Sequence, residues 1–303
     1  MCPARYGYLG PGGTFCEKAA LKYFGGGHEM ISFRTIKEVV RNVKEGSIEK
    51  GVIPLENSLE GSVNLSLDLL VKESNIIITG EVIIPINHNL IGQKGLEVGN
   101  IKKVLSHPQA IAQTADFIEE NLPQAEIIYT ESTAAAAECA LKNRELAVIG
   151  SDQIAHLYGL SVIAEGIQDD DENYTRFIII SRSKGKFFYS TGYNNYQDTK
   201  KMYKTSIVCT PEVNKPGVLY EMLGEFAARK INLTRIESRP TRKKLGEYLF
   251  YIDLEGHYHD PLVAGALKEV RNMSGLFKIL GCYFKDNIKE GSSEKDAKCK
   301  KRA

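Results

Sequence analysis

The alternation of strand-like and helix-like segments constrains the fold of this chain most. Between Arg5 and Arg182, short apolar runs such as "RYGYLG" and "KGVIPLE" alternate with segments whose apolar residues recur every three or four positions. Alternation at period two or a short β-branched run indicates a strand, and a period of 3.6 indicates a helix. Strands that alternate with helices predict an α/β layer fold with a mostly parallel sheet.

Two interruptions of this alternation of strands and helices divide the N-terminal part of the chain into two lobes. A long double strand covers residues 75–93, and strand character returns in "LSVIAEGI" before the apolar run that begins at Phe177. Two passages of the chain between the lobes, near residues 80–84 and 155–163, would return the last strand to the first lobe. We expect residues 1–182 to form one domain with a ligand cleft between its two lobes.

A second pattern follows a polar, tyrosine-rich stretch, residues 183–202, which we interpret as a linker. From residue 203 to 285 the order is strand, helix, strand, strand, helix, strand, which is the βαββαβ unit of ferredoxin-like domains. Residues 286–303 contain almost no apolar residues, and we predict that this tail is disordered.

Charge and composition exclude several classes of function. A net charge of +1 produces no field that would favour nucleic acid or an anionic membrane. The six cysteines are scattered without a C-x-x-C pair, which indicates reduced thiols, and the six histidines show no metal-ligand spacing. We see no signal peptide and no apolar stretch of about 20 residues. We expect a cytoplasmic protein that uses no metal or other cofactor.

Polar residues recur where a predicted strand leads into a helix. "GYLGPGGTF" lacks both the third glycine of a dinucleotide loop and the Lys-Ser/Thr of a P-loop. It still delivers Thr14 to a helix N-terminus, where Thr14 is either a helix cap or part of an anion site. The same construction recurs at Asn57 with Ser58, Ser106 with His107, Ser132 with Thr133, and Ser151. One such residue is more often a cap, but several along one parallel sheet predict an anion site.

The segment "DDENYTRFIIISR" places a hydroxyl and a guanidinium, Thr175 and Arg176, at the mouth of a buried strand. A permanently charged guanidinium beside a dry strand suits a carboxylate or a phosphate. The alternative is an ion pair with the acidic run of residues 169–172. Because no Cys-His or Ser-His-Asp spacing is present, we expect a site that binds a small carboxylate and works mainly with hydroxyl groups.

Six motifs, in this order and spacing, resemble those of prephenate dehydratases: "YLGPGGTF", "IPLENSLEGSVN", "SHPQAIAQ", "STAAAA", "AVIGSDQIAHLYGL" and "NYTRF". The segments "NKPGVLYEML" and "RIESRP" resemble the ACT regulatory domain of the same enzymes. The resemblance covers roughly residues 5–284. It implies a two-lobed catalytic domain like the type 2 periplasmic binding proteins. It also implies conversion of prephenate to phenylpyruvate, carbon dioxide and water in L-phenylalanine biosynthesis. We recognise no chorismate mutase segment, so we expect a monofunctional enzyme.

The resemblance also implies roles for individual residues. Thr175 is implied as the catalytic residue, which would hydrogen-bond the leaving hydroxyl, and Arg176 would hold a substrate carboxylate. We therefore expect Thr175→Ala to fold and lose turnover, and Arg176→Leu mainly to weaken substrate binding. The other implied substrate-binding residues are Thr14, Asn57, Ser58, His107, Ser132, Thr133 and Phe177.

An ACT domain implies regulation by L-phenylalanine and pairing of subunits into a homodimer or homotetramer. The implied effector-binding residues are Asn214, Gly217, Val218, Leu219, Glu237 and Ser238. Two alternatives remain open. One is arogenate dehydratase, which acts on the amino analogue of prephenate. The other, of a different class, is a non-catalytic sensor of small carboxylates, which would tolerate the loss of Thr175.

Overall fold

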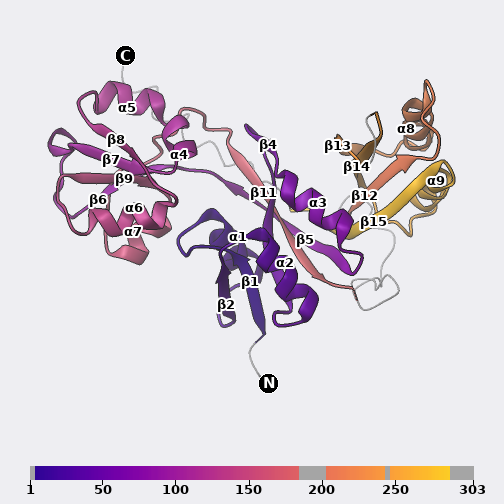
Figure 1. Ribbon diagram of the computed structural model, residues 1–303, viewed down its shortest axis with the longest axis horizontal. Helices are drawn as coiled ribbons and strands as arrows, with labels where there is room; N and C mark the ends of the chain where they lie inside the picture. The colour runs from indigo at the N-terminus through magenta and orange to yellow at the C-terminus, as the bar shows by residue number, and fades with distance from the viewer. Residues whose placement is uncertain (1–3, 184–202, 243–245, 287–303) are drawn as a thin grey trace, which may run out of the picture.

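The computed structural model describes residues 4–183, 203–242 and 246–286. Residues 184–202 of the predicted linker and 287–303 of the predicted tail lie outside the described residues. Figure 1 shows three bodies in a row: lobe 2 on the left, lobe 1 in the centre and the C-terminal domain on the right. Within the described ranges, no helix has both the length and the apolar character needed to cross a bilayer.

Lobe 1 is a sheet in the order β2-β1-β3-β11-β5, with the short β4 beside β3. Its strands are β1 (Arg5–Leu9), β2 (Glu29–Phe33), β3 (Lys50–Asn57), β4 (Gly61–Ser62), β5 (Ile76–Pro85) and β11 (Tyr174–Arg182). Its helices are α1 (Phe15–Phe24), α2 (Ile36–Glu45) and α3 (Asn64–Lys72). Strands β2, β1 and β3 are parallel, and β11 is antiparallel to both of its neighbours.

Local sequence sets the ends of these helices. In α2, the Thr35 side chain accepts a hydrogen bond from the Glu38 amide, and Gly46 ends the helix with φ of 82°. A hydroxyl satisfies a free amide at a helix start, and glycine adopts the left-handed conformation without strain. Between these caps, Val39 and Val43 are fully buried against the sheet because they lie on one face of the helix.

Lobe 2 is a second sheet in the order β10-β6-β9-β7-β8. Its strands are β6 (Asn89–Gly92), β7 (Lys103–Ser106), β8 (Glu126–Tyr129), β9 (Leu146–Gly150) and β10 (Ser161–Ala164). Its helices are α4 (Pro108–Ala112), α5 (Ala115–Asn121), α6 (Thr133–Ala140) and α7 (Asp152–Tyr158), with a 3₁₀ turn η1 (Val98–Asn100). The predicted two-lobed architecture is confirmed, because the two parts of the domain form separate sheets.

Two details of the predicted lobes were wrong. The sheets are mixed rather than mostly parallel, because β11 enters lobe 1 antiparallel and β6 and β10 run against their neighbours. The chain passes between lobes at residues 86–88 and 165–173, not at 80–84 and 155–163. Val82 and Ile84 belong to the core of lobe 1, and β10 pairs with β6 inside lobe 2, so both passages come later along the chain.

The C-terminal domain confirms the predicted βαββαβ order. Its elements are β12 (Tyr203–Pro211), α8 (Val218–Ala228), β13 (Leu233–Pro240), β14 (Tyr248–Glu255), α9 (Pro261–Asn272) and β15 (Ser274–Phe284). The strands lie in the order β13-β14-β12-β15. Met222 and Phe226 of α8 and Ala266 of α9 pack with Ile207 and Ile252 of the sheet in one buried cluster.

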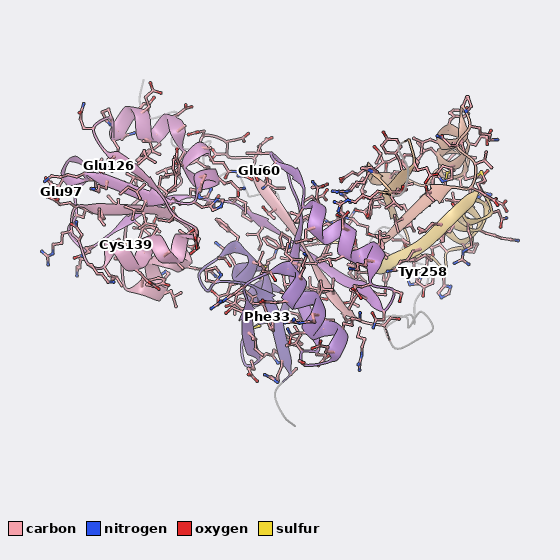
Figure 2. The ribbon with its side chains drawn as sticks, viewed as in Figure 1. Phe33, Glu60, Glu97, Glu126, Cys139 and Tyr258 are labelled. Atoms are coloured by element: carbon pink, nitrogen blue, oxygen red, sulfur yellow. The ribbon has the colours of Figure 1, made fainter. Side chains whose placement is uncertain are left out.

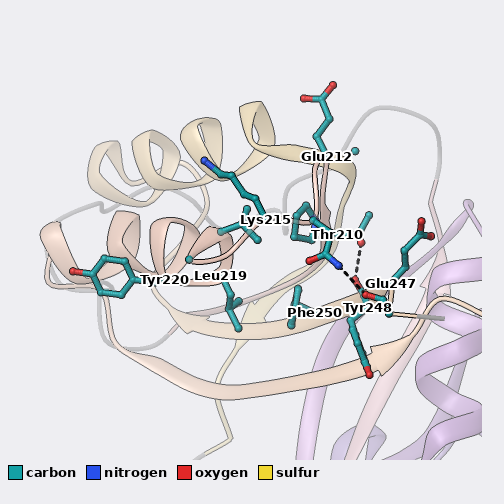
Figure 3. A pocket seen from close by; sticks show the side chains of 14 residues that line it. Thr210, Glu212, Lys215, Leu219, Tyr220, Glu247, Tyr248 and Phe250 are labelled. Atoms are coloured by element: carbon teal, nitrogen blue, oxygen red, sulfur yellow. Dashed lines mark hydrogen bonds between the residues drawn. The ribbon is translucent and has the colours of Figure 1, made fainter. Parts of the chain in front are cut away.

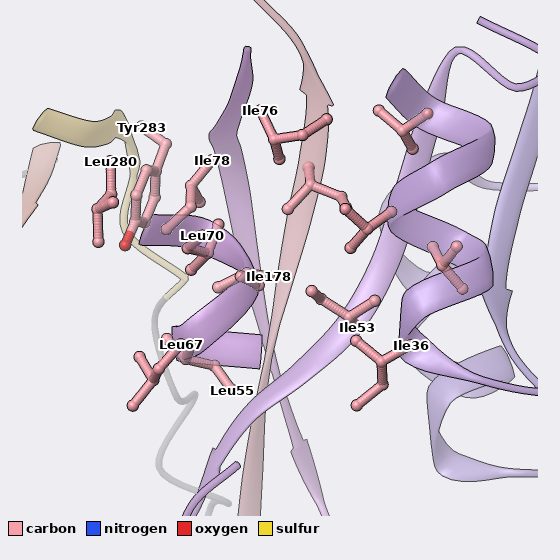
Figure 4. Packing of buried hydrophobic residues seen from close by; sticks show 14 of the residues in the cluster. Ile36, Ile53, Leu55, Leu67, Leu70, Ile76, Ile78, Ile178, Leu280 and Tyr283 are labelled. Carbon is pink, nitrogen blue, oxygen red and sulfur yellow. The ribbon is translucent and has the colours of Figure 1, made fainter. Parts of the chain in front are cut away.

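The two domains share one continuous sheet. Strand β15 runs parallel to β5, with Gly281 opposite Ile78. A Cβ atom at Gly281 would lie 2.2 Å from the Ile78 carbonyl oxygen, so glycine is required for this close approach. In Figure 4, Leu280 and Tyr283 of β15 lie in the same buried cluster as Leu70 and Ile78 of lobe 1. The C-terminal domain is therefore attached to lobe 1 by backbone pairing and by a common core.

Candidate active site

A cavity of about 260 Å³ lies between the two lobes. Lobe 1 contributes residues from α1, β3 and β11 to its wall, and lobe 2 contributes residues from α4 and α6. Six residues predicted for the site line this cavity: Thr14, Asn57, His107, Thr133, Thr175 and Phe177. The sequence prediction of an interlobe site built from strand-to-helix turns therefore coincides with an actual cavity.

Strand alternation decides which side chains of β11 reach the cavity. Successive side chains of a strand point to opposite faces of the sheet. Thr175 and Phe177 line the cavity, and Arg176 between them does not. On the paired strand, Asn57 lies opposite Thr175 and Glu56 lies opposite Arg176. One face of this strand pair therefore carries Thr175 with Asn57, and the other face carries Arg176 with Glu56.

The amide of Asn57 holds the hydroxyl of Thr175. Asn57 Oδ1 accepts hydrogen bonds from the backbone amides of Leu59 and Glu60, both at 3.0 Å. The Nδ2 atom therefore faces the other way and donates to Thr175 Oγ1 at 2.9 Å. A threonine hydroxyl has one proton and two lone pairs. Because Thr175 accepts from Asn57, its own proton remains available to a ligand in the cavity.

Thr14 and His107 are both helix caps and lining residues. Thr14 Oγ1 accepts from the Glu17 amide at 3.4 Å and donates to the Pro11 carbonyl at 3.0 Å. His107 Nδ1 accepts from the Gln109 amide at 3.3 Å. Of the two alternatives raised for Thr14, the helix cap is observed, and Thr14 also lies in the cavity wall, while its part in an anion site stays a prediction.

Ser58 and Ser132 lie outside the residues that line the cavity. The Ser58 hydroxyl donates to the Glu172 carbonyl at 2.9 Å and accepts from the Tyr174 amide at 2.9 Å, which anchors the loop before β11. The Ser132 hydroxyl accepts from the Ala135 amide at 3.2 Å and caps α6. Their hydroxyls position the backbone around the cavity rather than face a ligand.

The structure corrects the prediction for Arg176. Its side chain is only 6% exposed and lies on the face of β11 that is opposite the cavity. Its guanidinium contacts Asp253 at 2.6 Å, Glu81 at 2.7 Å and Glu56 at 2.8 Å. The terminal nitrogen Nη2 donates to the Tyr283 hydroxyl at 2.7 Å. The partners also differ from the acidic run at residues 169–172, so neither sequence-based alternative for Arg176 is correct.

The opposite charges of Arg176 and Asp253 shift the pKa values of both groups. Burial by itself would lower the pKa of Arg176, but attraction from Asp253 and other acidic neighbours outweighs it and raises the pKa. Burial would raise the pKa of Asp253, but Arg176 outweighs it and holds the pKa below its usual value. The attraction between Arg176 and Asp253 therefore favours the charged form of both groups.

The residues that the sequence analysis missed include three that are joined by hydrogen bonds: His88, Gln113 and Asn173. His88 and Gln113 line the cavity. Gln113 Oε1 lies 2.9 Å from His88 Nε2 and 3.1 Å from Asn173 Nδ2. Gln113 and Asn173 lie inside two of the recognised motifs, "SHPQAIAQ" and "NYTRF", so these motifs could have indicated that both residues belong to the site. His88 follows the apolar end of a strand, and nothing in its spacing distinguished it.

A second cavity, of about 440 Å³, lies in the C-terminal domain between the start of α8 and the strands of the sheet (Figure 3). Four predicted effector-binding residues line it: Asn214, Gly217, Val218 and Leu219. The Asn214 side chain donates to the Gly246 carbonyl at 3.2 Å, which joins two loops at its edge.

Two predicted effector-binding residues, Glu237 and Ser238, are outside this second cavity. They lie on β13, an end strand of the long sheet. Glu237 forms an ion pair with Arg235 and accepts a hydrogen bond from Ser62 of lobe 1. Ser238 is exposed.

Comparison with known proteins identifies the families of both domains. A family model described as "Prephenate dehydratase" matches residues 6–185, and an "ACT domain" model matches residues 212–272. The chain belongs to the prephenate dehydratase family. The resemblance seen in the motifs is thereby confirmed, and the ACT domain coincides with the βαββαβ unit.

Two curated relatives and one solved structure show how far the similarity extends. The prephenate dehydratase of Bacillus subtilis is 36% identical over 92% of this chain and 98% of its own. That of Methanocaldococcus jannaschii is 40% identical over 91% of this chain and 96% of its own. The prephenate dehydratase of Arthrobacter aurescens, solved in complex with L-Phe, is 35% identical. It covers 93% of this chain and 90% of its own with a TM-score of 0.82.

Proposed function

We propose that the interlobe cavity is the active site for the decarboxylating dehydration of prephenate to phenylpyruvate, carbon dioxide and water. The observation that carries this proposal is the Thr175 hydroxyl, which lines the cavity and accepts a hydrogen bond from Asn57, so that its own proton is available for donation. The two residues come from adjacent, paired strands, so their separation is set by the sheet and does not depend on a mobile loop.

The chemistry of the substrate matches such a site. In prephenate, the bond from the ring to its carboxylate breaks and its electron pair enters the ring as the hydroxyl leaves from the opposite carbon. Aromatisation of the ring drives the reaction, so the enzyme has to orient the substrate and assist the hydroxyl. A threonine is too weak an acid to supply the proton alone. Thr175 therefore hydrogen-bonds the leaving oxygen, and the proton that completes the water molecule comes ultimately from solvent.

The lining of the cavity favours prephenate over arogenate. Among the described residues that line it, none is aspartate, glutamate, lysine or arginine. Arogenate carries an ammonium group where prephenate has a ketone, and a desolvated ammonium requires a carboxylate partner. The carboxylates of prephenate can instead be held by neutral donors at helix starts, among them the Thr133 hydroxyl and the backbone amides at the start of α1 next to Thr14. A permanent positive charge is not needed when several such donors converge.

The test is turnover of each substrate by the purified protein. Prephenate should yield phenylpyruvate, detected by its absorbance in alkali, and kcat/KM for arogenate should be at least tenfold lower. Turnover of arogenate with the higher kcat/KM would reverse the assignment of substrate. No turnover of either compound, with prephenate nevertheless bound in calorimetry, would favour the sensor alternative.

We further propose that the second cavity binds L-phenylalanine as a feedback inhibitor. The bound L-Phe in the Arthrobacter aurescens relative supports this assignment, as do the four predicted residues along the cavity. Regulation then requires L-phenylalanine to bind one state of the enzyme more tightly than the other. A homodimer or homotetramer, and a cytoplasmic location, stay predictions.

Asn214→Ala should weaken L-phenylalanine binding about tenfold and leave the rate without L-phenylalanine unchanged, because it removes a polar group at the second cavity alone. Isothermal titration calorimetry and prephenate turnover check the two parts. Ser238→Ala is the informative companion. It lies outside the cavity within one chain, so weaker binding in this variant would indicate a site completed by β13 of a second subunit. Unaltered binding in both variants would contradict the assignment.

Glu56 offers a route from the ACT domain to the active site. One oxygen of its carboxylate contacts Arg176 at 2.8 Å, and the other contacts Arg235 of β13 at 2.8 Å. Glu56 immediately precedes Asn57 and pairs with Arg176, which immediately follows Thr175. A shift of β13 on effector binding would therefore act directly on the two strands that hold Thr175 and Asn57.

Arg235→Gln should uncouple inhibition from binding. The variant keeps the second cavity, so L-phenylalanine should bind with an affinity within about threefold of the unaltered protein, while maximal inhibition of turnover falls by half or more. Calorimetry and inhibition curves on the same preparation provide the comparison. Full inhibition in Arg235→Gln would show that the signal takes another route.

A further inference from the structure

A chain of hydrogen bonds runs from the catalytic hydroxyl to a buried histidine. Asn57 Nδ2, which donates to Thr175, also donates to Asn173 Oδ1 at 2.7 Å. Asn173 Nδ2 donates to Gln113 Oε1 at 3.1 Å, and the same oxygen lies 2.9 Å from His88 Nε2. These five side chains come from both lobes and from both passages between them.

The backbone determines the direction of every bond in this chain. The amides of Leu59 and Glu60 occupy Asn57 Oδ1, so Asn57 can only donate toward Asn173. The Asn173 oxygen is thereby used, and its amide group must donate to Gln113 Oε1. The amide orientation of Gln113 agrees with this, because its Nε2 donates to the exposed carboxylate of Glu60 at 3.2 Å. His88 Nε2 therefore has to carry a proton and donate it to Gln113.

The surroundings of His88 support this neutral form with the proton on Nε2. The side chain is buried, 5% exposed, and Nδ1 has no hydrogen-bond partner among the described residues. A second proton on Nδ1 would leave a buried donor unsatisfied, which is costly. Burial also lowers the pKa of His88, and this effect outweighs those of Gln113 and Asp169, which would raise the pKa. The ring edge contacts Phe15, with 5.9 Å between ring centroids, which fixes its orientation.

We propose that His88 is a positioning residue for the dehydration, which holds the Thr175 hydroxyl proton toward the substrate through Gln113, Asn173 and Asn57. This inference rests on the proposed function of the interlobe cavity. His88 acts at the far end of the chain, where it keeps Gln113 Oε1 turned toward Asn173. Without that donor, Gln113 is held only by the bond from Asn173 and by the exposed Glu60 carboxylate, so the end of the chain next to lobe 2 is less firmly ordered.

The placement of the chain also makes it sensitive to the position of the lobes. Gln113 follows α4 of lobe 2, whereas Asn57 and Thr175 belong to lobe 1. Figure 2 shows Glu60, the second anchor of Gln113, on the part of lobe 1 that faces lobe 2. His88 lies in the passage between them, and its backbone amide donates to Gln168 Oε1 in the second passage at 3.0 Å. The hydrogen bonds therefore connect Thr175 only when the lobes lie as they do here.

The experiment compares His88→Leu with His88→Gln in prephenate turnover. His88→Leu removes the donor and should lower kcat about tenfold with KM changed less than twofold, because the substrate still binds. Glutamine retains an N–H donor on a side chain of similar reach, so His88→Gln should keep kcat within about threefold of the unaltered protein. Circular dichroism and thermal unfolding confirm that both variants are folded.

A double-variant comparison separates positioning from a general structural effect. In a Thr175→Ala background, His88→Leu should cost no further activity, because the group that it positions is gone. Equal losses in His88→Leu and His88→Gln would overturn the proposal. The proposal would also be overturned if the loss of kcat from His88→Leu multiplied with the loss from Thr175→Ala in the double variant. A rise in KM at constant kcat in His88→Leu would overturn it as well. If the unaltered protein itself fails to convert prephenate, the proposed function fails first and this inference with it.

Discussion

Thr175→Ala should lower kcat for prephenate by about 10²–10⁴-fold, because it removes the hydroxyl that assists the leaving group. The fold should persist, since Asn57 Nδ2 keeps two other acceptors, Asn173 Oδ1 at 2.7 Å and the Tyr174 carbonyl at 3.1 Å. Steady-state kinetics with prephenate measure the loss, and urea unfolding should show a change in stability of less than about 1 kcal/mol.

Thr175→Ser is the matched control for this result. It retains the hydroxyl and loses only a methyl group, so it should keep a substantial part of the turnover. Full activity in Thr175→Ala would show that the hydroxyl has no part in the reaction. A large loss in both variants, with serine no better than alanine, would mean that the shape of the threonine side chain matters more than its hydroxyl.

Arg176→Met should destabilise the protein by roughly 3–5 kcal/mol, because it leaves the buried Asp253 carboxylate without its main counter-charge. The Asp253 side chain is 5% exposed, so water cannot take over the role of Arg176, whereas Glu81 keeps its ion pair with Lys204. The structure thus replaces the earlier expectation that loss of Arg176 mainly weakens substrate binding. Arg182→Met, an exposed arginine on the same strand, is the control and should change stability by less than about 1 kcal/mol.

The destabilisation caused by Arg176→Met should become smaller as the pH falls. With Arg176 present, the pKa of Asp253 is below its ordinary value of 3.8, so the pair stabilises the protein above that pH and loses its effect under acid conditions. With Arg176 absent, burial dominates and raises the pKa of Asp253. The variant then gains stability as the pH falls and Asp253 takes up a proton.

Urea unfolding of both proteins at pH 7 and pH 5 tests this sign. The difference in unfolding free energy between the unaltered protein and Arg176→Met should be smaller at pH 5 than at pH 7. A difference that is constant or that grows on acidification would mean that packing, and not the uncompensated charges, causes the loss. Binding of prephenate to folded Arg176→Met should be nearly unaffected, because Arg176 lies behind the cavity wall.

Local patterns predicted the elements and many of the cavity residues. The βαββαβ domain could be predicted from hydrophobic periodicity. Each of its strands and helices buries one face, so apolar residues recur in the sequence with the period of a strand or of a helix. Thr14, Asn57 and Thr133 were found because strand ends and helix starts are marked by capping residues, and these ends converge on one side of the sheet in lobe 1 and lobe 2.

The orientation of Arg176 illustrates what local patterns left open. The apolar run begins at Phe177, yet β11 begins at Tyr174, so Thr175 and Arg176 are themselves strand residues on opposite faces. Its partners Asp253 and Tyr283 are 77 and 107 residues away along the chain. The local sequence around an arginine at the start of a strand is the same whether its side chain faces a substrate or a neighbouring domain.

The sequence by itself determined the two kinds of domain and the family, because these depend on periodicity, order and short motifs, and through the resemblance it predicted the role of Thr175. Only the tertiary structure decided the face on which each side chain lies and the joining of β15 to β5. It also decided the passage points between the lobes and the chain of bonds from Thr175 to His88. These features depend on pairing between distant segments, and pairing is a property of the folded sheet that no local stretch of residues encodes.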